Sequence, residues 1–449
     1  MSVILRIKDL TDQQQLFIRK NLTFTPKEEF RRFDAYIEQP DKLPIYLFIV
    51  EGEGDNKVVK IPLIFAASTF QIIPNIHKTF PNVNFNFTGT LRQNQVEVAN
   101  EASVHLNKFG TTTLNLHPGF GKTILGAYLS SNLKKLTLVI CNRGVLIKQW
   151  RKSYNDATDA KTFIVGGNQK DEDEKNIYPI EECPVILCMN SRIKQIPTNI
   201  LYNIGTVMFD EAHLLCTPSN VDMLLATQPF YVIVMTATPE RTDELDGMMK
   251  AIAGTHEIVR KNTKKVTVIK LMTNTEIAEV PKQSNGDTNF SGLQNLIFED
   301  ERRNNIICSL AGGNYANEHI LILTKYTKHA KLLYDMLKKH DVNCGTLYGS
   351  KNNYNECRVL IGTLSKIGTG FDQQNACKNF SGNRFRILLL VCSIKKKQML
   401  EQVIGRVTRH DSPVIIHFVD NNPIIKRHYG EAKKVYIEMN ADIQTVKIP

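Results

Sequence analysis

The chain has 449 residues, of which 42% are hydrophobic and 22% charged, a composition typical of a soluble globular protein with two or three domains. No run of about 18 apolar residues predicts a transmembrane helix, and Arg6 and Lys8 interrupt the apolar start expected of a signal peptide. We therefore expect no membrane partner. The nine scattered cysteines form no Cys-x-x-Cys pair, so we expect no zinc site, no disulfide framework and an intracellular, reducing compartment.

The net charge of +11 is unevenly distributed along the chain. Residues 251–449 carry 29 Lys and Arg against 18 Asp and Glu, whereas residues 1–250 carry 27 of each kind. A basic half beside a neutral half favours a polyanion such as nucleic acid as partner. Charge that only keeps the surface solvated is the alternative.

The first 85 residues predict a small accessory α+β domain. Its expected elements are a strand at Val3–Ile7, a capped helix at Thr11–Lys20 and a hairpin of Ile45–Val50 with Lys60–Phe65. This domain could bind nucleic acid or serve only as a scaffold packed on the next domain.

The pattern changes at Gln95, which opens a predicted helix over Val96–Leu106. A glutamine amide offers a donor and an acceptor together, and the edge of adenine requires both. An exposed helix glutamine is the alternative interpretation.

A glycine-rich turn joins a predicted buried strand ending at Leu116 to an apolar helix, in the pattern of a phosphate-binding loop. Glycine N–H groups and the helix N-terminus can surround a triphosphate. Lys122 can reach the β- and γ-phosphates, and the Thr123 hydroxyl can hold Mg²⁺. Leu116 departs from the full motif, which has glycine there. The residues assigned to the nucleotide are Gly119, Phe120, Gly121, Lys122 and Thr123.

Short apolar strands alternate with helical or polar segments after this loop, which predicts a parallel sheet covered on both faces. One strand ends in Asp210 and Glu211, and parallel-sheet sites gather their catalytic groups at such ends. One carboxylate can hold Mg²⁺ through water while the other accepts a proton from the attacking water. A solvated helix start is the usual explanation of an isolated Asp-Glu pair.

A further strand, Tyr231–Thr236, ends in the hydroxyls of Thr236 and Thr238. Together with Gln95, the Gly-Lys-Thr loop and Asp210-Glu211-Ala212-His213, it forms an ordered set that resembles the motifs of superfamily 2 helicases. The resemblance implies ATP and Mg²⁺ as cofactors, Asp210 and Thr123 at the metal, and Glu211 in catalysis.

The second half of the chain continues the resemblance. Residues 252–270 are predicted to form a linker that runs into a strand at Val266–Leu271, and Met272–Gln294 to form a loop. Gly368–Asp372 follows a strand and resembles motif V, which assigns Gly370 and Asp372 to the nucleotide. Lys395–Lys397 form a cationic run that could touch strand phosphates or only solvate a surface helix.

Gln402, Arg406 and Arg409 resemble motif VI of the same helicases. Their spacing of i, i+4 and i+7 predicts one face of an amphipathic helix. The resemblance implies that the two arginines act on the phosphates as arginine fingers when two domains close.

We therefore predict two RecA-like α/β domains in tandem, each with a parallel sheet covered by helices, plus the small N-terminal α+β domain. The expected boundaries are 1–85 for the accessory domain, 86–255 for the ATP-binding domain and 256–449 for the C-terminal helicase domain. The resemblance implies a helicase or translocase that hydrolyses ATP in the cleft between the two domains. Its expected substrate is nucleic acid, with DNA favoured, as a single strand or a fork.

Within superfamily 2, Leu146–Trp150 and Thr236–Arg241 resemble a DNA-directed group. That group includes the TFIIH-type, phage recombination and poxvirus-type transcript-release helicases, and it suggests a viral member. A viral protein would work with transcription or replication machinery, in the host cytoplasm or the virion. The alternatives are a duplex translocase, an annealing or transcript-release ATPase that separates no strands, and an RNA helicase.

Overall fold

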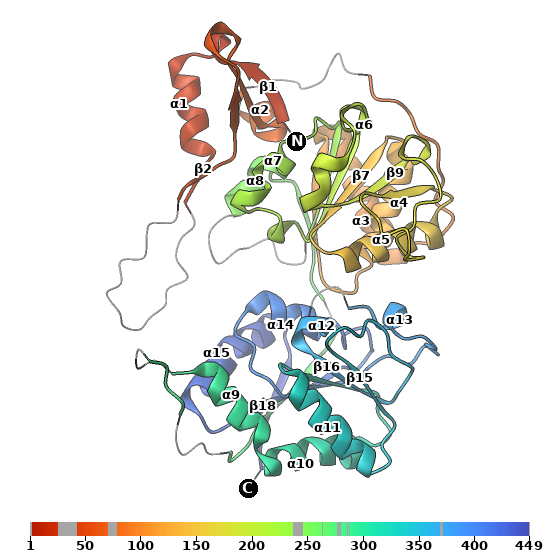
Figure 1. Ribbon diagram of the computed structural model, residues 1–449, viewed down its shortest axis with the longest axis vertical. Coiled ribbons are helices and arrows are strands. Elements are labelled where there is room, and N and C mark those ends of the chain that lie inside the picture. The colour runs from red at the N-terminus through yellow and green to blue at the C-terminus, as the bar shows by residue number, and fades with distance from the viewer. Residues whose placement is uncertain are drawn as a thin grey trace. The chain divides into compact units, whose positions relative to one another are not determined.

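The computed structural model describes residues 2–25, 43–70, 79–236, 246–262, 264–275, 280–284, 286, 288–368 and 371–448. The chain divides into two compact units, Met1–Arg260 and Lys261–Pro449 (Figure 1). Each unit is built on a seven-stranded sheet in which every pairing is parallel. This confirms the predicted tandem of RecA-like α/β domains.

The sheet of the first unit has the strand order β12-β6-β11-β10-β7-β9-β8. The carboxyl ends of parallel strands meet at one edge of a sheet, so the loops after β6 and β10 open on the same edge. The strands are β6 Thr111–Leu116, β7 Thr137–Cys141, β8 Thr162–Ile164, β9 Val185–Met189, β10 Thr206–Asp210, β11 Tyr231–Thr236 and β12 Glu257–Arg260.

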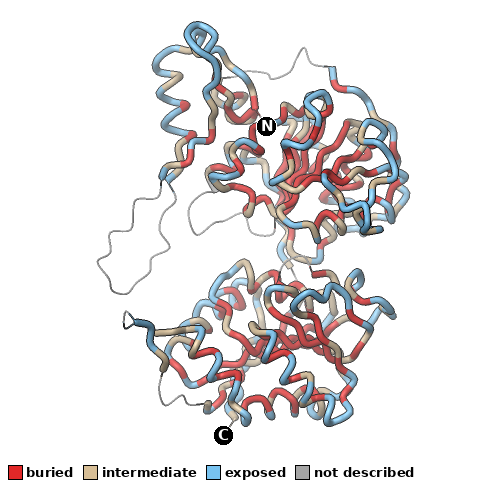
Figure 2. Tube along the Cα trace, viewed as in Figure 1, coloured by how far each residue is buried: buried red, intermediate tan, exposed pale blue. Residues whose placement is uncertain are grey.

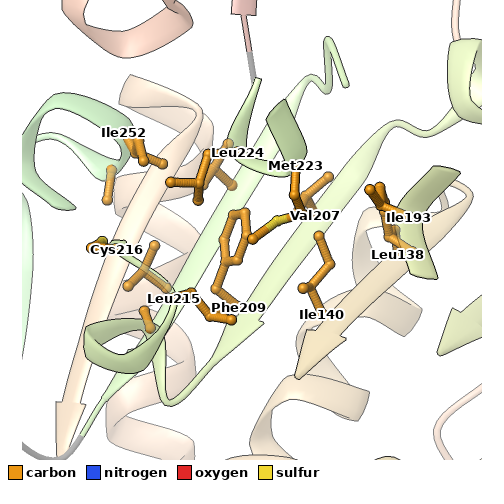
Figure 3. Packing of buried hydrophobic residues seen from close by; sticks show 14 of the residues in the cluster. Leu138, Ile140, Ile193, Val207, Phe209, Leu215, Cys216, Met223, Leu224 and Ile252 are labelled. Atoms are coloured by element: carbon orange, nitrogen blue, oxygen red, sulfur yellow. The ribbon is translucent and has the colours of Figure 1, made fainter. Parts of the chain in front are cut away.

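Helices cover both faces of this sheet because its strands are apolar on both sides. Val139 and Met208 pack against one set of helices, α3 to α5, whereas Leu138, Val207 and Phe209 point to the opposite face, towards α7 and α8 (Figure 3). Figure 2 shows the strands as the buried centre of each unit. The helices are α3 Gln93–Phe109, α4 Lys122–Leu133, α5 Gly144–Ala157, α6 Thr198–Asn203, α7 Val221–Leu224 and α8 Asp246–Ala253.

The N-terminal segment forms a small α+β domain with a three-stranded antiparallel sheet, as predicted. Buried side chains such as Leu22 and Ile61 belong to the same hydrophobic cluster as Phe209 of the first parallel sheet. This domain is therefore packed on the sheet that follows it. Its elements are β1 Ser2–Arg6, α1 Asp12–Asn21, β2 Thr23–Phe24, β3 Ile45–Tyr46, β4 Ile49–Glu51, β5 Val58–Pro62 and α2 Leu63–Phe70.

The predicted hairpin in this domain is correct in its centre and wrong at its ends. Strands β4 and β5 pair antiparallel around the turn, but Ile45–Tyr46 pairs with β2 instead. Leu63–Phe65 belongs to helix α2, because Leu63 and Ala66 are buried one turn apart and a strand would separate them.

The sheet of the second unit has the strand order β15-β16-β14-β17-β18-β13-β19. The strands are β13 Thr267–Met272, β14 Ile320–Thr324, β15 Cys344–Leu347, β16 Val359–Thr363, β17 Ile387–Leu390, β18 Val414–Val419 and β19 Asp442–Lys447. The helices are α9 Phe290–Glu299, α10 Glu301–Ser309, α11 Thr327–Lys339, α12 Leu364–Ile367, α13 Gln373–Ala376, α14 Lys397–Ile404 and α15 Pro423–Glu438.

Two expectations about the connection between the sheets are wrong. Residues 257–260 form the edge strand β12 rather than a linker, because Ile258 is buried in the core and the strand pairs with β6. The expected loop up to Gln294 ends earlier, because the Asn289 side chain caps α9 by accepting a hydrogen bond from the backbone N–H of Gly292 (2.9 Å).

The described helices include none that is both long and apolar enough to cross a bilayer. All nine cysteines are buried free thiols.

A buried ion pair joins α10 to the carboxyl end of β18. Arg303, only 1% exposed, donates from Nε to Oδ1 of Asp420 (2.7 Å) and from Nη2 to the carbonyl of Val391 (2.9 Å). Thr273 donates to the same Asp420 oxygen (2.7 Å). Three elements of the second unit therefore meet at one carboxylate.

We expect Arg303→Ala to destabilise the protein by about 3–5 kcal/mol, because it leaves Asp420 buried without a counter-charge. The exposed Lys339 on α11 provides the control, and Lys339→Ala should change stability by less than about 0.5 kcal/mol. Urea unfolding followed by circular dichroism measures both. Equal stability of the two variants would contradict the role given to this pair.

Candidate nucleotide-binding site

The loop between β6 and α4 has the backbone of a phosphate-binding turn. Gly119 and Gly121 have φ angles of 85° and 94°, in the left-handed region that glycine adopts without strain. Lys122, the first residue of α4, donates from Nζ to the carbonyl of Leu116 (3.0 Å). The Leu116 side chain is buried in the core, so the departure from glycine leaves the loop intact.

Gln95 holds this loop from the first turn of α3. It is 2% exposed, and its Nε2 donates to the carbonyls of Phe120 (3.1 Å) and Gly121 (3.3 Å). Its Oε1 accepts from the backbone N–H of Arg92 (2.9 Å). A Cβ at Gly121 would lie 2.4 Å from the Gln95 amide nitrogen, so this contact requires glycine. Thr123 lies half-buried in the first turn of α4.

Asp210 ends β10 and is 4% exposed. Its Oδ2 accepts a hydrogen bond from Nε1 of Trp150 (2.9 Å), and its Oδ1 accepts one from the backbone N–H of Glu211 (3.0 Å). Burial and the neighbouring Glu211 carboxylate raise the pKa of Asp210 to about 6, although Lys122 and both hydrogen bonds oppose the rise. Burial and Glu211 thus disfavour the charged form of Asp210, whereas Lys122 and the two hydrogen bonds favour it.

Glu211 has an unusual backbone and an unused carboxylate oxygen. Its φ of 50° is rare for a residue other than glycine, and such conformations cluster at functional sites. Its Oε2 is buried, lies 3.5 Å from Nδ1 of His213 and has no hydrogen-bond partner among the residues that the structure describes. His213 in turn lies within hydrogen-bond distance of the Thr236 hydroxyl (3.1 Å), which links the ends of β10 and β11.

These residues fit Mg²⁺ and a nucleotide triphosphate. The glycine turn, the helix N-terminus and Lys122 suit phosphates, while the oxygens of Thr123 and Asp210 suit a hard cation. Within the described ranges, no group of three or more His, Cys, Asp or Glu side chains could hold a metal by itself. A metal here would take its remaining ligands from water and phosphate, as Mg²⁺ does in phosphate sites.

In the second unit, Arg409 and Asp372 are joined by an ion pair between Nη1 and Oδ2 (2.5 Å). Burial alone would raise the pKa of Asp372, but the Arg409 guanidinium outweighs it and lowers that pKa. Arg406 donates to the carbonyls of Ile367 (3.3 Å) and Gly368 (3.2 Å). Motif VI thus holds the motif V loop in place. Gly370 and residues 237–245 lie outside the described residues.

The expected helix face of Gln402, Arg406 and Arg409 is wrong. Helix α14 ends at Ile404, and both arginines lie in the turns that follow Gly405. Gln402 alone is on the helix, where it is buried. These turns place both arginines against the motif V loop. A straight continuation of α14 would carry them past that loop.

Sequence reasoning missed two contacts in the first unit. One joins Trp150 to Asp210, and the other joins Gln95 to the phosphate-binding loop. In the sequence, Trp150 only ends the segment Leu146–Trp150 that carries the resemblance, yet its indole N–H donates to Asp210, 60 residues further along the chain. A buried tryptophan must find a partner for its N–H, which is the one signal that pointed to a polar contact.

A glycine loop after β6 and an Asp-Glu pair after β10, on one edge of a parallel sheet, define the class of P-loop nucleotide hydrolases. The family model for the res subunit of type III restriction enzymes matches residues 88–241. Protein 161L of Invertebrate iridescent virus 6, a helicase by name, is 30% identical over 88% of this chain and 91% of its own length.

Transcript termination protein A18 of Rabbit fibroma virus (strain Kasza) is 22% identical over 92% of this chain and 88% of its own length. Among solved structures, S. cerevisiae Dbp5 bound to RNA and ADP BeF3 has a TM-score of 0.52 at 15% identity and covers 79% of this chain and 89% of that chain. The chain belongs to the superfamily 2 helicases, as its motif order predicted, and is an ATP-dependent nucleic-acid helicase.

Arg409→Ala should lower kcat for ATP hydrolysis far more than it weakens nucleotide binding. An arginine finger contributes about 10³–10⁵ in rate because it stabilises charge that develops in the transition state. Steady-state ATPase rates and nucleotide titration measure the two quantities.

Arg386 provides the matched control, because it pairs with Glu318 in the same unit, at the opposite edge of the sheet. Arg386→Ala should leave kcat unchanged. An Arg409→Ala protein with normal kcat and weaker ATP binding would show that the finger is misassigned.

Proposed function

We propose that this helicase acts on DNA, with Mg·ATP bound by the first unit and completed for catalysis by arginines of the second. The observation that supports the nucleotide site most directly is buried Asp210, with half-buried Glu211 beside it, at the same sheet edge as the glycine loop. Mg²⁺ would supply a positive centre that neutralises charge developing on the phosphates.

Each residue of the first unit has a role that its contacts suit. The loop backbone from Gly119 to Gly121 and Lys122 bind the phosphates, and Asp210 with Thr123 orients the metal. Glu211 positions and deprotonates the attacking water, because its Oε2 is buried without a hydrogen-bond partner in the described structure. Gln95 recognises adenine. Because its amide also hydrogen-bonds to the phosphate-binding loop, it links adenine recognition to the position of that loop.

The second unit contributes Arg406, Arg409 and the motif V residues Gly370 and Asp372, with Gln402 supporting them from α14. Arg409 is paired with Asp372 here, so it must exchange this partner for phosphate oxygens during turnover. The exchange keeps the guanidinium paired in both states, and it leaves the Asp372 carboxylate, 23% exposed, without this counter-charge.

A cluster of cationic and aromatic side chains suits nucleic acid at the carboxyl edge of the second sheet. We call it the Lys325 cluster: Phe290, Lys325, Tyr326, Ser393 and His428. The Lys325 Nζ lies 5.4 Å from the ring centroids of both Phe290 and Tyr326. Phe290 meets His428 edge-on at 5.2 Å, and Ser393 Oγ lies 2.7 Å from Nδ1 of His428.

The charge around this cluster is positive. Burial lowers the pKa of His428, and the nearby Arg427, Lys395 and Lys325 lower it further. Phe290 and Tyr326 are half-buried, and cations beside aromatic rings occur in sites that bind phosphates and stack bases. The lysines of the predicted cationic run Lys395–Lys397 have different surroundings. Lys397 pairs with Glu438 (2.6 Å), whereas Lys395 lies near His428.

DNA is favoured over RNA by the sequence resemblance to DNA-directed helicases and by the match to a restriction-enzyme subunit. Similarity to a viral transcript termination protein supports a role with viral transcription or replication machinery, inside an infected cell or the virion. Transcript release is the second candidate process, and it needs translocation without separation of long duplexes.

Strand separation on labelled forks tests the proposal, with DNA and RNA forks of both polarities compared. We expect ATP-dependent displacement on a DNA fork of one polarity. Glu211→Gln should bind ATP normally yet neither hydrolyse it nor separate strands, and Lys122→Ala should lose turnover. Wild-type hydrolysis by Glu211→Gln would refute its assigned role, and displacement of RNA forks alone would refute the choice of DNA.

Replacing Lys325 and Lys395 together by Ala should weaken DNA binding at every sequence, because phosphate contacts do not depend on the bases. Each lost contact should also make the fall of log K with log salt shallower by about 1. Titrations of single strands and forks at several salt concentrations measure this slope. Lys331 and Lys339, exposed on α11, give the matched control with the same change in charge. A slope equal to that of this control variant would exclude the cluster from the DNA path.

A further inference from the structure

Trp150 is the only tryptophan of the chain, and it is fully buried on α5. Its indole Nε1 donates to Oδ2 of Asp210 at 2.9 Å. The far end of the ring lies against Gly126 of α4, where an added Cβ would come within 2.6 Å of Cη2. The ring therefore occupies a space that a larger residue on α4 would close.

The two oxygens of Asp210 are each held by one donor. The backbone N–H of Glu211 fixes Oδ1, and the indole fixes Oδ2 from a separate helix. Rotation of the carboxylate would break both bonds in a place where only 4% of the residue is exposed to water. Loss of a buried bond of this kind is costly, so the two donors define one orientation.

Indole suits this task better than other donors. It has an N–H and no acceptor, so it always donates to the carboxylate. It carries no charge, so it leaves the full negative charge of Asp210 available to a cation. A lysine or arginine at this position would instead neutralise the carboxylate.

We propose that Trp150 is a positioning residue, whose indole N–H holds the Asp210 carboxylate in the orientation that binds Mg²⁺ with the nucleotide. The inference rests on the proposed metal role of Asp210. The alternative is that Asp210 serves only as the hydrogen-bond acceptor for a buried indole N–H. In that case replacing Trp150 would not change metal binding.

The test uses Trp150→Phe, which keeps an aromatic ring in the core and removes the N–H. Binding of Mn²⁺ in the presence of β,γ-imido-ATP is measured by the electron paramagnetic resonance of free Mn²⁺. Loss of a group that orients a metal ligand weakens metal affinity by about 10–100-fold, and we expect about tenfold because Asp210 contacts the metal largely through water.

Tyr154 gives a matched control one turn further along α5. It is also fully buried, and its hydroxyl lies 2.9 Å from Ser130 Oγ, away from Asp210. Tyr154→Phe removes one buried hydrogen bond from the same helix and should leave Mn²⁺ affinity at the wild-type value. Equal weakening by both substitutions, or by neither, would overturn the inference.

Asp210→Asn separates this inference from the proposed function. If Asp210→Asn binds Mn²⁺ like the wild type, the metal assignment itself fails. If Asp210→Asn loses Mn²⁺ while Trp150→Phe keeps it, only the role of Trp150 fails.

A second measurement needs no substitution at Trp150. A protein labelled with ¹⁵N-tryptophan gives one indole N–H resonance, which reports directly on the bond to Asp210. Addition of Mg²⁺ with β,γ-imido-ATP should shift this resonance, and the analogue without Mg²⁺ should shift it less. An indole signal that ignores Mg²⁺ would overturn the inference even if Trp150→Phe does not fold.

Discussion

The candidate nucleotide site depends on one constraint, a carboxyl group that is buried at the end of β10. A buried charge is tolerated only when hydrogen bonds and opposite charges compensate it. Asp210 receives the indole of Trp150, the N–H of Glu211 and the field of Lys122. The two hydrogen bonds come from α5 and from the strand end, and the positive charge comes from α4, so three separate elements converge on one side chain.

Close packing around the site explains why two of its positions are glycine. Gly126 leaves room for the indole ring, and Gly121 leaves room for the Gln95 amide. The phosphate loop is therefore braced from α3 on one side, while α4 carries Lys122 and packs on the tryptophan that orients Asp210. Under the proposed function this packing would position the loop before a nucleotide binds, and preorganised donors of this kind lower a barrier.

The second unit uses paired charges in a different way. Arg303 and Asp420 are buried and join structural elements, whereas the side chains of Arg409 and Asp372 are 21% and 23% exposed. Three further cations, Arg427, Lys395 and Lys325, lie near His428. The proposed function thus assigns structure, catalysis and substrate binding to separate cations of one basic unit.

The sequence by itself determined the two parallel sheets, the loop after β6 and the Asp-Glu pair after β10. Apolar strands, glycine turns and motif order are local patterns, so they can be recognised in the sequence without knowledge of tertiary contacts. The tertiary structure decided the edge strand β12, helix α2 in place of a longer hairpin, and the turns that carry Arg406 and Arg409 beyond α14. It also decided that Trp150 meets Asp210, because partners 60 residues apart are chosen by how helices pack on a sheet.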